Sequence, residues 1–318
     1  MRFKRLFIVD IFYIIIRMCG SLTNRIDTIS YSYDITASKE ELSMLKLFGL
    51  FAQNLNKITF VGIHFFALAV FFVPVTFLAI ELCIVLYFIR MMGITAGYHR
   101  DLSHLSYKSN RWIRFIFAFI GCSAMQKGPL WWAAHHRRHH QHSDMEGDPH
   151  SPVKRGWFYA HIGWIFSGKQ NENDLSNVKD LVKFSELRWL NKYHLLPGLC
   201  LSVICFLLHE WSGVIWGFAL STVLLYHGTF LVNSVCHLFG KRRFNTSDES
   251  RDNAFVAIIL TLGEGWHNGH HARQARARHG VYWYELDFTY YLLWFLSLFG
   301  CVWDIKKAPP KMIKPTRS

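Results

Sequence analysis

Four long apolar segments constrain the fold more than any other feature of this chain. A helix needs about 20 apolar residues to cross the hydrocarbon core of a bilayer. Segments of roughly this length cover residues 58–75, 77–98, 194–210 and 213–236. Short connections join the first to the second, near Pro74, and the third to the fourth, so the segments form two pairs. Because 51% of the chain is hydrophobic, the sequence predicts an all-α integral membrane protein with four transmembrane helices in two hairpins.

The remaining apolar stretches are weaker candidates for membrane spans. Residues 112–125 are short and contain Arg114, and residues 282–303 carry Glu285 and Asp287 near their start. We expect both to be interfacial helices. Residues 1–55 begin with basic residues and an apolar run that Asp10 interrupts, which indicates an uncleaved cytoplasmic or interfacial segment. A single membrane domain over 56–305 and a basic tail over 306–318 complete the predicted organisation.

The distribution of Lys and Arg predicts which side of the membrane each connection faces. The connections near residues 72–81 and 210–213 contain neither residue, whereas the other connections are basic. The positive-inside rule therefore places the basic connections and both termini in the cytoplasm. The formal net charge of +13 could suit a nucleic acid, but the charges lie between apolar runs, so we expect no nucleic-acid partner. A bacterial inner membrane is the predicted location, with the endoplasmic reticulum as the alternative.

Nine histidines recur in short motifs that follow or precede the hairpins. They are His99, His104, His136, His139, His140, His237, His267, His270 and His271. No span lies between the first two motifs, and one hairpin lies between the second and the last. All of these motifs therefore face the same, cytoplasmic side of the membrane. A solvated basic surface does not explain two repeats of H-x-x-H-H on one side, so we predict a metal site.

Helical spacing tests whether these side chains can converge. Positions i, i+3 and i+4 share a helix face, so each H-x-x-H-H motif can point three imidazoles at one place. His99 and His104 are five apart, roughly 140° around a helix. These two converge only if the helix ends or bends there, or if they serve different metals. Asn233 shares a face with His237 and could hold a metal-bound water.

Nine imidazoles are too many for one metal ion and suit two metals with open positions. Imidazole binds iron, copper, zinc and nickel, and spacing does not choose among them. We expect the other histidines discussed to be packed or surface residues rather than ligands; these are His64, His135, His142, His150, His161, His194, His209, His227 and His279.

The order H-x4-H, H-x2-H-H, H-x2-H-H around two hairpins resembles the membrane fatty-acyl desaturases, most closely the stearoyl-CoA (acyl-CoA Δ9) desaturases. The resemblance runs from about residue 75 to residue 305. Further similar stretches are GDPHS (147–151), RGWFYAHIGW (155–164), TFLVNSVCHLFG (229–240), SRDNAFVA (250–257) and LGEGWHNGHH (262–271).

This resemblance implies a fold of four transmembrane helices with a helical cytoplasmic cap that holds a di-iron centre. The nine histidines would bind two iron ions, and Asn233 would reach an iron through water. Gln126, Trp132 and Thr229 would line a bent acyl tunnel, and Lys169 is a candidate headgroup contact. Asp144, Asp148 and Glu264 are candidates for orienting the ligands, or else are helix caps or surface charges.

The implied activity is the O2-dependent insertion of a cis double bond into a saturated fatty acyl chain carried by CoA or another acyl carrier. The chain has no haem-binding loop, flavin fingerprint or iron–sulfur cysteine spacing, so electrons must come from an external cytochrome, ferredoxin or rubredoxin-like protein with its reductase. Gly168 stands where animal members carry a basic residue, which leaves the carrier open. The stretch after HNGHH also departs from animal members and indicates a bacterial-style variant. The alternatives are a membrane di-iron hydroxylase of alkane, sterol or carotenoid type and, more remotely, a membrane metal transporter.

Overall fold

The computed structural model describes residues 54–167 and 174–307. The chain divides into two compact units, Met1–Leu55 and Asn56–Ser318, and the description below concerns the second. The N-terminal segment predicted over 1–55 lies almost entirely outside the described residues. The predicted headgroup contact Lys169 and residues 308–318 of the basic tail lie outside them as well.

Three helical segments in the described part of the chain are long and apolar enough to cross a membrane, where the sequence predicted four. The first is Asn54–Phe71, which ends in the 3-10 turn η1 (Leu68–Phe71). The second is Phe77–Ser103, which consists of α3 (Phe77–Met92) and the π-helical segment η2 (Gly93–Ser103). The third is Leu196–Ser234, which consists of α10 (Leu196–Ser212), η6 (Gly213–Leu220) and α11 (Ser221–Ser234).

The third segment has a sharp break, and this break explains why three segments are found where four were predicted. His209 and Glu210 have non-helical backbone angles, and Glu210 is left-handed with φ 47°. On either side of the break the chain packs against itself, since a Cβ added to Gly213 would overlap the carbonyl oxygen of Cys205. A Cβ added to Gly217 would lie 3.2 Å from the Cys205 sulfur. The segment therefore folds back on itself at the predicted turn.

The turn after the first apolar segment meets the break inside the third. The Thr76 hydroxyl oxygen lies 2.7 Å from His209 Nε2, and the Ser212 hydroxyl donates to the carbonyl oxygen of Pro74 at 3.0 Å. These contacts join the two ends of the helical pairs that lack basic residues.

The remaining helical elements are short, and two of them, α5 and α12, carry the H-x-x-H-H motifs. They are α4 (Arg111–Ser123), α5 (Pro129–His142), α6 (Pro152–Arg155), η3 (Tyr159–Gly163), α7 (Trp164–Phe166), η5 (Ser176–Val178), α8 (Lys179–Val182), α9 (Ser185–Lys192), η7 (Val256–Leu260), α12 (His267–Ala272) and α13 (Phe288–Leu298). Two short strands, β1 (Lys108–Ser109) and β2 (Val302–Trp303), pair antiparallel. The predicted interfacial stretches thus form α4 and α13, both shorter than a membrane span.

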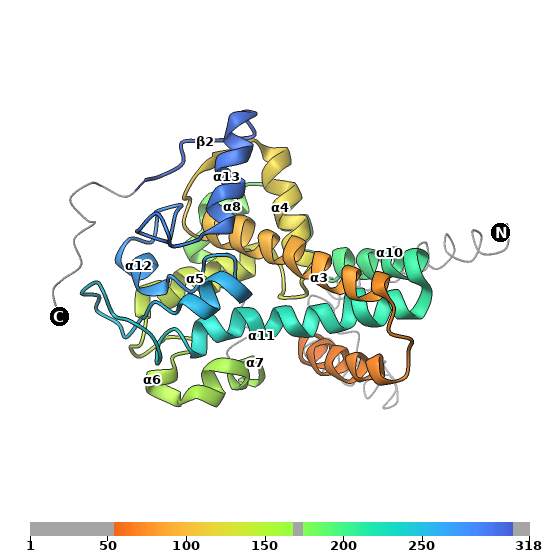
Figure 1. Ribbon diagram of the computed structural model, residues 1–318. Coiled ribbons are helices and arrows are strands. Elements are labelled where there is room, and N and C mark those ends of the chain that lie inside the picture. Colours follow the sequence, from red (N-terminus) through yellow and green to blue (C-terminus); the bar gives the residue numbers. More distant parts are fainter. Residues whose placement is uncertain (1–53, 168–173, 308–318) are drawn as a thin grey trace, which may run out of the picture. The chain divides into compact units, whose positions relative to one another are not determined.

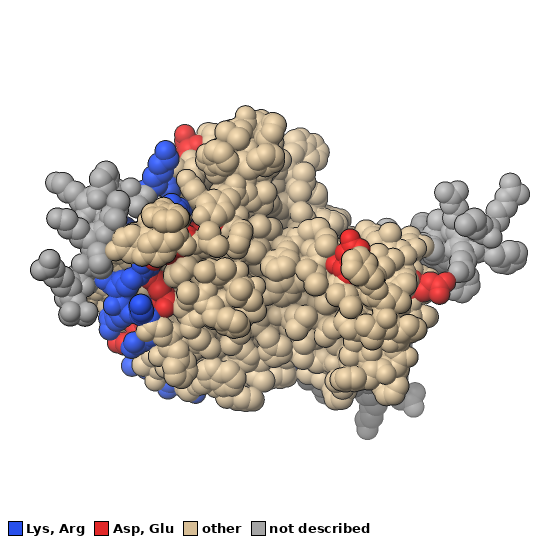
Figure 2. All heavy atoms as spheres, viewed as in Figure 1, with Lys and Arg blue, Asp and Glu red and all other residues tan. Residues whose placement is uncertain are grey.

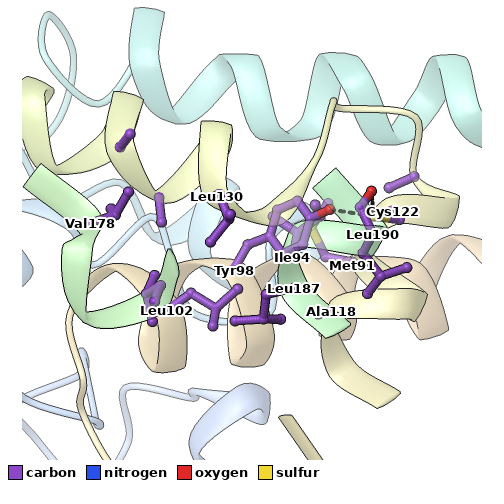
Figure 3. Close-up of a cluster of buried hydrophobic side chains, with 14 of the residues drawn as sticks. Met91, Ile94, Tyr98, Leu102, Ala118, Cys122, Leu130, Val178, Leu187 and Leu190 are labelled. Atoms are coloured by element: carbon purple, nitrogen blue, oxygen red, sulfur yellow. Dashed lines mark hydrogen bonds between the residues drawn. The ribbon is translucent and has the colours of Figure 1, made fainter. Parts of the chain in front are cut away.

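A buried apolar cluster holds the base of the histidine-bearing helices (Figure 3). Met91, Ile94 and Tyr98 from α3 and η2 pack against α4 and α5 there. The Tyr98 hydroxyl donates to the sulfur of Cys122 on α4 at 2.9 Å. Because interiors of this kind are closely packed, the cluster fixes the positions from which the histidines project.

Charged side chains are unevenly distributed along the described part of the chain. In Figure 2, Lys and Arg gather at the end where α5 and α12 lie in Figure 1, whereas the visible surface over α3, α10 and α11 is almost free of charge. This distribution agrees with apolar helices inside a membrane and histidine motifs beyond one of its faces.

Candidate metal centre

His99 and His104 converge because the second apolar helix widens at its end. Within η2, hydrogen bonds join residues five apart, and the backbone N–H of His104 donates to the carbonyl oxygen of His99 at 3.2 Å. A π-helix therefore stacks positions five apart roughly one turn above each other. The two imidazole ring centres lie 4.7 Å apart. From the spacing, these two rings could share one site only if the helix ended or bent there, and the π-helical winding is the change that brings them together. Such π-helical segments are frequent at functional sites.

Each H-x-x-H-H motif is divided between two places, which differs from the expectation that its three imidazoles point at one. On α5, His136 and His140 face one side while His139 faces another. On α12, His270 joins the first side, and His267 and His271 join the second. The reason is geometric, since i+3 and i+4 lie about 100° apart around a helix, enough to aim at two neighbouring points.

The nine predicted histidines thus fall into two groups of convergent nitrogen atoms, within each of which all the nitrogens lie within 4.8 Å of one another. The first histidine group is His99, His104, His136, His140 and His270. The second histidine group is His139, His237, His267 and His271. The two groups adjoin, because the His140 and His271 rings lie 4.4 Å apart.

The arrangement of the Nε2 atoms fits a metal ion better than a hydrogen-bonded cluster. In the first group, Nε2 of His136 lies 2.8 Å from Nε2 of His104 and 3.0 Å from Nε2 of His140. In the second, Nε2 of His237 lies 3.0 Å from Nε2 of His267. Two nitrogens bound at right angles to a metal at about 2.1 Å lie about 3.0 Å apart. Facing lone pairs repel unless a cation lies between them.

Four carboxylates fix ring orientation from behind. Asp144 lies 2.8 Å from Nδ1 of His237 and Asp148 lies 3.0 Å from Nδ1 of His139. Glu264 lies 2.5 Å from Nδ1 of His99. All three were candidates from the sequence. A carboxylate on Nδ1 holds the proton there and leaves Nε2 as a free lone pair.

The fourth carboxylate, Asp248, was missed by the sequence prediction. Its Oδ2 lies 2.6 Å from Nδ1 of His271, and its Oδ1 accepts a hydrogen bond from the backbone N–H of Ser250. Asp248 belongs to the polar stretch TSDES, where one acidic residue looks like another. No sequence signal distinguishes it from a surface charge.

Burial and charge set the protonation states that metal binding needs. Burial, reinforced by neighbouring imidazoles, lowers the pKa of His104, His136, His140, His267 and His270 well below the usual range of histidine. Their rings are therefore neutral at pH 7, as metal ligands must be. Burial opposes ionisation of Glu264, but His99, His279 and Arg100 lower its pKa overall.

Two histidines that were predicted to be non-ligands lie directly against the site. Nδ1 of His279 lies 3.3 Å from the Glu264 carboxylate, and its ring lies 4.4 Å from that of His270. Nδ1 of His150 lies 3.8 Å from Asp148. Each of these two histidines therefore lies beside a carboxylate that also contacts a predicted ligand. Their isolated positions in the sequence gave no indication that they lie next to the site.

An apolar cavity reaches both histidine groups. His99 and His136 from the first group line it, as do His139 and His267 from the second. Gln126, Trp132, Thr229, Asn233 and Glu264, which the sequence also singled out, line it as well.

The predicted substrate residues come together in the wall of this cavity. Gln126 Nε2 donates to the Thr229 hydroxyl oxygen at 2.8 Å. The Trp132 indole stacks on the His136 imidazole with ring centres 5.0 Å apart. The apolar cavity therefore has one polar contact, the Gln126–Thr229 hydrogen bond, in its wall and extends to the two histidine groups.

These features define an integral membrane protein with two adjoining histidine groups beside an apolar cavity. The model of the Fatty acid desaturase family matches residues 75–303. The chain belongs to this family, which confirms the resemblance found in its motifs.

Curated relatives act on different carriers and positions. The chain is 41% identical over 219 residues to palmitoyl-monogalactosyldiacylglycerol delta-7 desaturase of Arabidopsis thaliana, covering 68% of this chain but only 58% of that protein. It is 39% identical over 251 residues to acyl-CoA C20 Delta5-desaturase of Anemone leveillei, covering 77% of this chain and 79% of that protein. It is 37% identical over 260 residues to sn-1 stearoyl-lipid 9-desaturase of Anabaena variabilis, covering 80% of this chain and 94% of that protein.

Proposed function

We propose that this chain is an O2-dependent acyl desaturase that inserts a cis double bond at the Δ9 position of a stearoyl chain. The observation that carries the proposal is the meeting of two histidine groups at one apolar cavity in a member of the desaturase family. Each histidine group would hold one iron, and Asn233 would contact the second group's iron through water. When bound, the two irons would supply the redox chemistry that breaking an unactivated C–H bond requires.

The protein's own residues would orient the ligands and the acyl chain. Asp144, Asp148, Asp248 and Glu264 hold protons on Nδ1 atoms and so direct Nε2 toward the metal. The contact between Gln126 and Thr229, which lies in the cavity wall together with Trp132, would bend the bound chain. A bent, water-poor cavity accepts an acyl chain in one register and so exposes one pair of carbons.

We further propose four membrane crossings, with the turn at His209–Glu210 separating the last two. The histidine groups would then form a cytoplasmic cap, at the basic end seen in Figure 2. The electron donor would be a separate cytochrome, ferredoxin or rubredoxin-like protein. The membrane would be a bacterial inner membrane, with the endoplasmic reticulum as the alternative.

The Δ9 position and the carrier belong to this proposal. The Anabaena protein, of which the chain covers the largest share among the three relatives described, is a stearoyl-lipid 9-desaturase, which supports a stearoyl chain and Δ9. The carrier predicted from the sequence is CoA, with Lys169 as a headgroup contact, whereas this relative supports a lipid. Supplying purified protein with stearoyl-CoA in one arm and stearoyl-phospholipid vesicles in the other distinguishes the two carriers.

The test is expression in a cell that lacks Δ9 desaturation and supplies an electron donor, with His140→Ala as the matched control. Gas chromatography with mass spectrometry of the fatty acids should show a cis-Δ9 product with the unaltered chain and none with the variant. A hydroxylated product would favour the hydroxylase alternative. No new product with a well-expressed, iron-loaded protein would overturn the proposal.

A further inference from the structure

Three polar contacts connect one face of α11 to the end of α4 and to the loop between α4 and α5. The residues on this face are Thr222, Tyr226 and Thr229, which follow helical spacing at i, i+4 and i+7. The loop runs from Ala124 to Gly128, directly after Ser123 at the end of α4, and carries Gln126. The contacts thus form a ladder along α11 that ends at the Gln126–Thr229 pair in the cavity wall.

Two of the three contacts are direct hydrogen bonds between α11 and the loop. At the cavity, Gln126 Nε2 donates to Thr229 at 2.8 Å. One turn earlier, the Tyr226 hydroxyl donates to the backbone carbonyl oxygen of Met125 at 2.9 Å. Tyr226 is 2% exposed and also lines the cavity, so its hydroxyl acts on the residue adjacent to Gln126.

The third rung runs through Arg90 of α3. Its Nη1 donates to the carbonyl oxygen of Ser123 at 3.3 Å and to the hydroxyl oxygen of Thr222 at 2.6 Å. Its Nη2 donates to the Ser221 hydroxyl oxygen. One guanidinium therefore joins the end of α4 to α11, a fork geometry that lysine does not reproduce.

The cost of placing Arg90 here indicates that it has a specific role. It is 1% exposed and lies within an apolar helix long enough to span the membrane. Among the described residues, no Asp or Glu lies within ion-pair distance of it, and the hydrogen bonds that it donates there all go to neutral oxygens. A charge in such a segment is expensive and marks a functional position.

The loop that the ladder holds has an unfavourable backbone. Met125 and Lys127 both have left-handed angles, with φ of 60° and 65°, on either side of Gln126. Such conformations in residues other than glycine persist only where surrounding contacts impose them. The position of the Gln126 amide in the cavity therefore depends on contacts that hold its neighbours.

We propose that Arg90 and Tyr226 are positioning residues that fix Gln126 against Thr229 and thereby determine where along the acyl chain the double bond forms. The inference rests on the proposed desaturase function. None of the nine histidines lies on the loop that carries Gln126, so loosening these contacts would shift the bend relative to the metal centre. Neighbouring carbons then compete for the same position.

The decisive variant is Tyr226→Phe, which removes one hydroxyl and keeps the ring. Losing a hydrogen bond of ordinary strength should lower the ratio of the main double-bond position to its neighbours by about fivefold. Mass spectrometry of derivatised products measures this ratio. Arg90→Met should shift it in the same direction, and Arg90→Lys should shift it less.

Tyr87→Phe is the matched control. Tyr87 is also buried and its hydroxyl also donates to a backbone carbonyl, that of Leu260, at 2.6 Å, but it makes no hydrogen bond to the loop. Its product ratio should equal that of the unaltered chain. An unchanged ratio in Tyr226→Phe, or an equal shift in Tyr87→Phe, would overturn the inference even if Arg90 variants fail to fold. Absence of any double bond with the unaltered chain would instead count against the proposed function.

Discussion

The imidazoles of His99 and His104 lie with ring centres 4.7 Å apart because the helix that carries them is wound as a π-helix. Gly93 and Gly97 lie on the same segment, and α4 packs closely against them. A Cβ on Gly93 would lie 2.5 Å from the backbone nitrogen of Gly121, and one on Gly97 would lie 2.9 Å from Cβ of Phe117. Small residues four apart allow helices in membranes to approach this closely.

Gly93→Ala should therefore push η2 away from α4 and disturb the first histidine group. Overpacking of this kind costs about 1–3 kcal/mol, so we expect a lower thermal unfolding temperature together with reduced iron content. Gly62→Ala is the control, because a Cβ at Gly62 meets nothing within 4 Å. Equal iron content in both variants would show that this helix contact does not position the histidines.

Asp248→Ala should weaken metal binding without removing a ligand. The loss of a carboxylate behind a metal-bound histidine lowers metal affinity or activity by about 10- to 100-fold, and here His271 would lose its orientation. Iron retention during titration with a chelator measures the effect. Asp174→Ala is the control, since Asp174 is exposed and pairs with Arg138 at 3.0 Å. Similar retention in both variants would contradict the role of Asp248.

Gly263→Ala tests the network behind His99. Gly263 has φ 127°, and a Cβ there would lie 2.5 Å from the Asp287 carboxylate, which pairs with Arg100 at 2.9 Å. We expect strong destabilisation, measured as a drop in unfolding temperature. Gly156 also has a positive φ, of 81°, but a Cβ there would meet no atom within 4 Å. Gly156→Ala therefore measures backbone strain without steric overlap. If the two variants unfold alike, strain alone accounts for the effect.

The sequence predicts those features of this site that depend on short segments of the chain, and it misses those that depend on how distant segments pack together. The identities of the nine clustered histidines and their common side follow from spacing and hydropathy, because both are properties of short segments. Their division into two groups does not follow, since it requires the relative rotation of α5, α12 and η2. The same holds for Asp248 and His279, which approach the site only through folding.

The fold shows the same limit. Four apolar segments and the turn near residues 210–213 were readable in the sequence, but it was not readable that helical geometry resumes so close to His209–Glu210 that α10, η6 and α11 form a single stretch of 39 residues. The widening of η2 is also invisible in composition, although Gly93 and Gly97 mark the place where α4 packs closely against it.

Acidification should destabilise the protein partly through His194. Burial lowers the pKa of this histidine to about 4, below its unfolded value of about 6.5. Between pH 6.5 and 4 the unfolded chain binds a proton that the folded chain does not, so stability falls as pH falls through this window. Thermal unfolding of His194→Gln should depend less steeply on pH than that of the unaltered protein. Parallel pH profiles would show that His194 does not contribute.

Iron content tests whether the two histidine groups form a dinuclear iron centre. Purified protein analysed by inductively coupled plasma mass spectrometry should contain two irons per chain. Fully folded protein that is isolated from iron-replete cells without chelators, and that contains no iron or holds another metal in its place, would rule out the dinuclear iron centre.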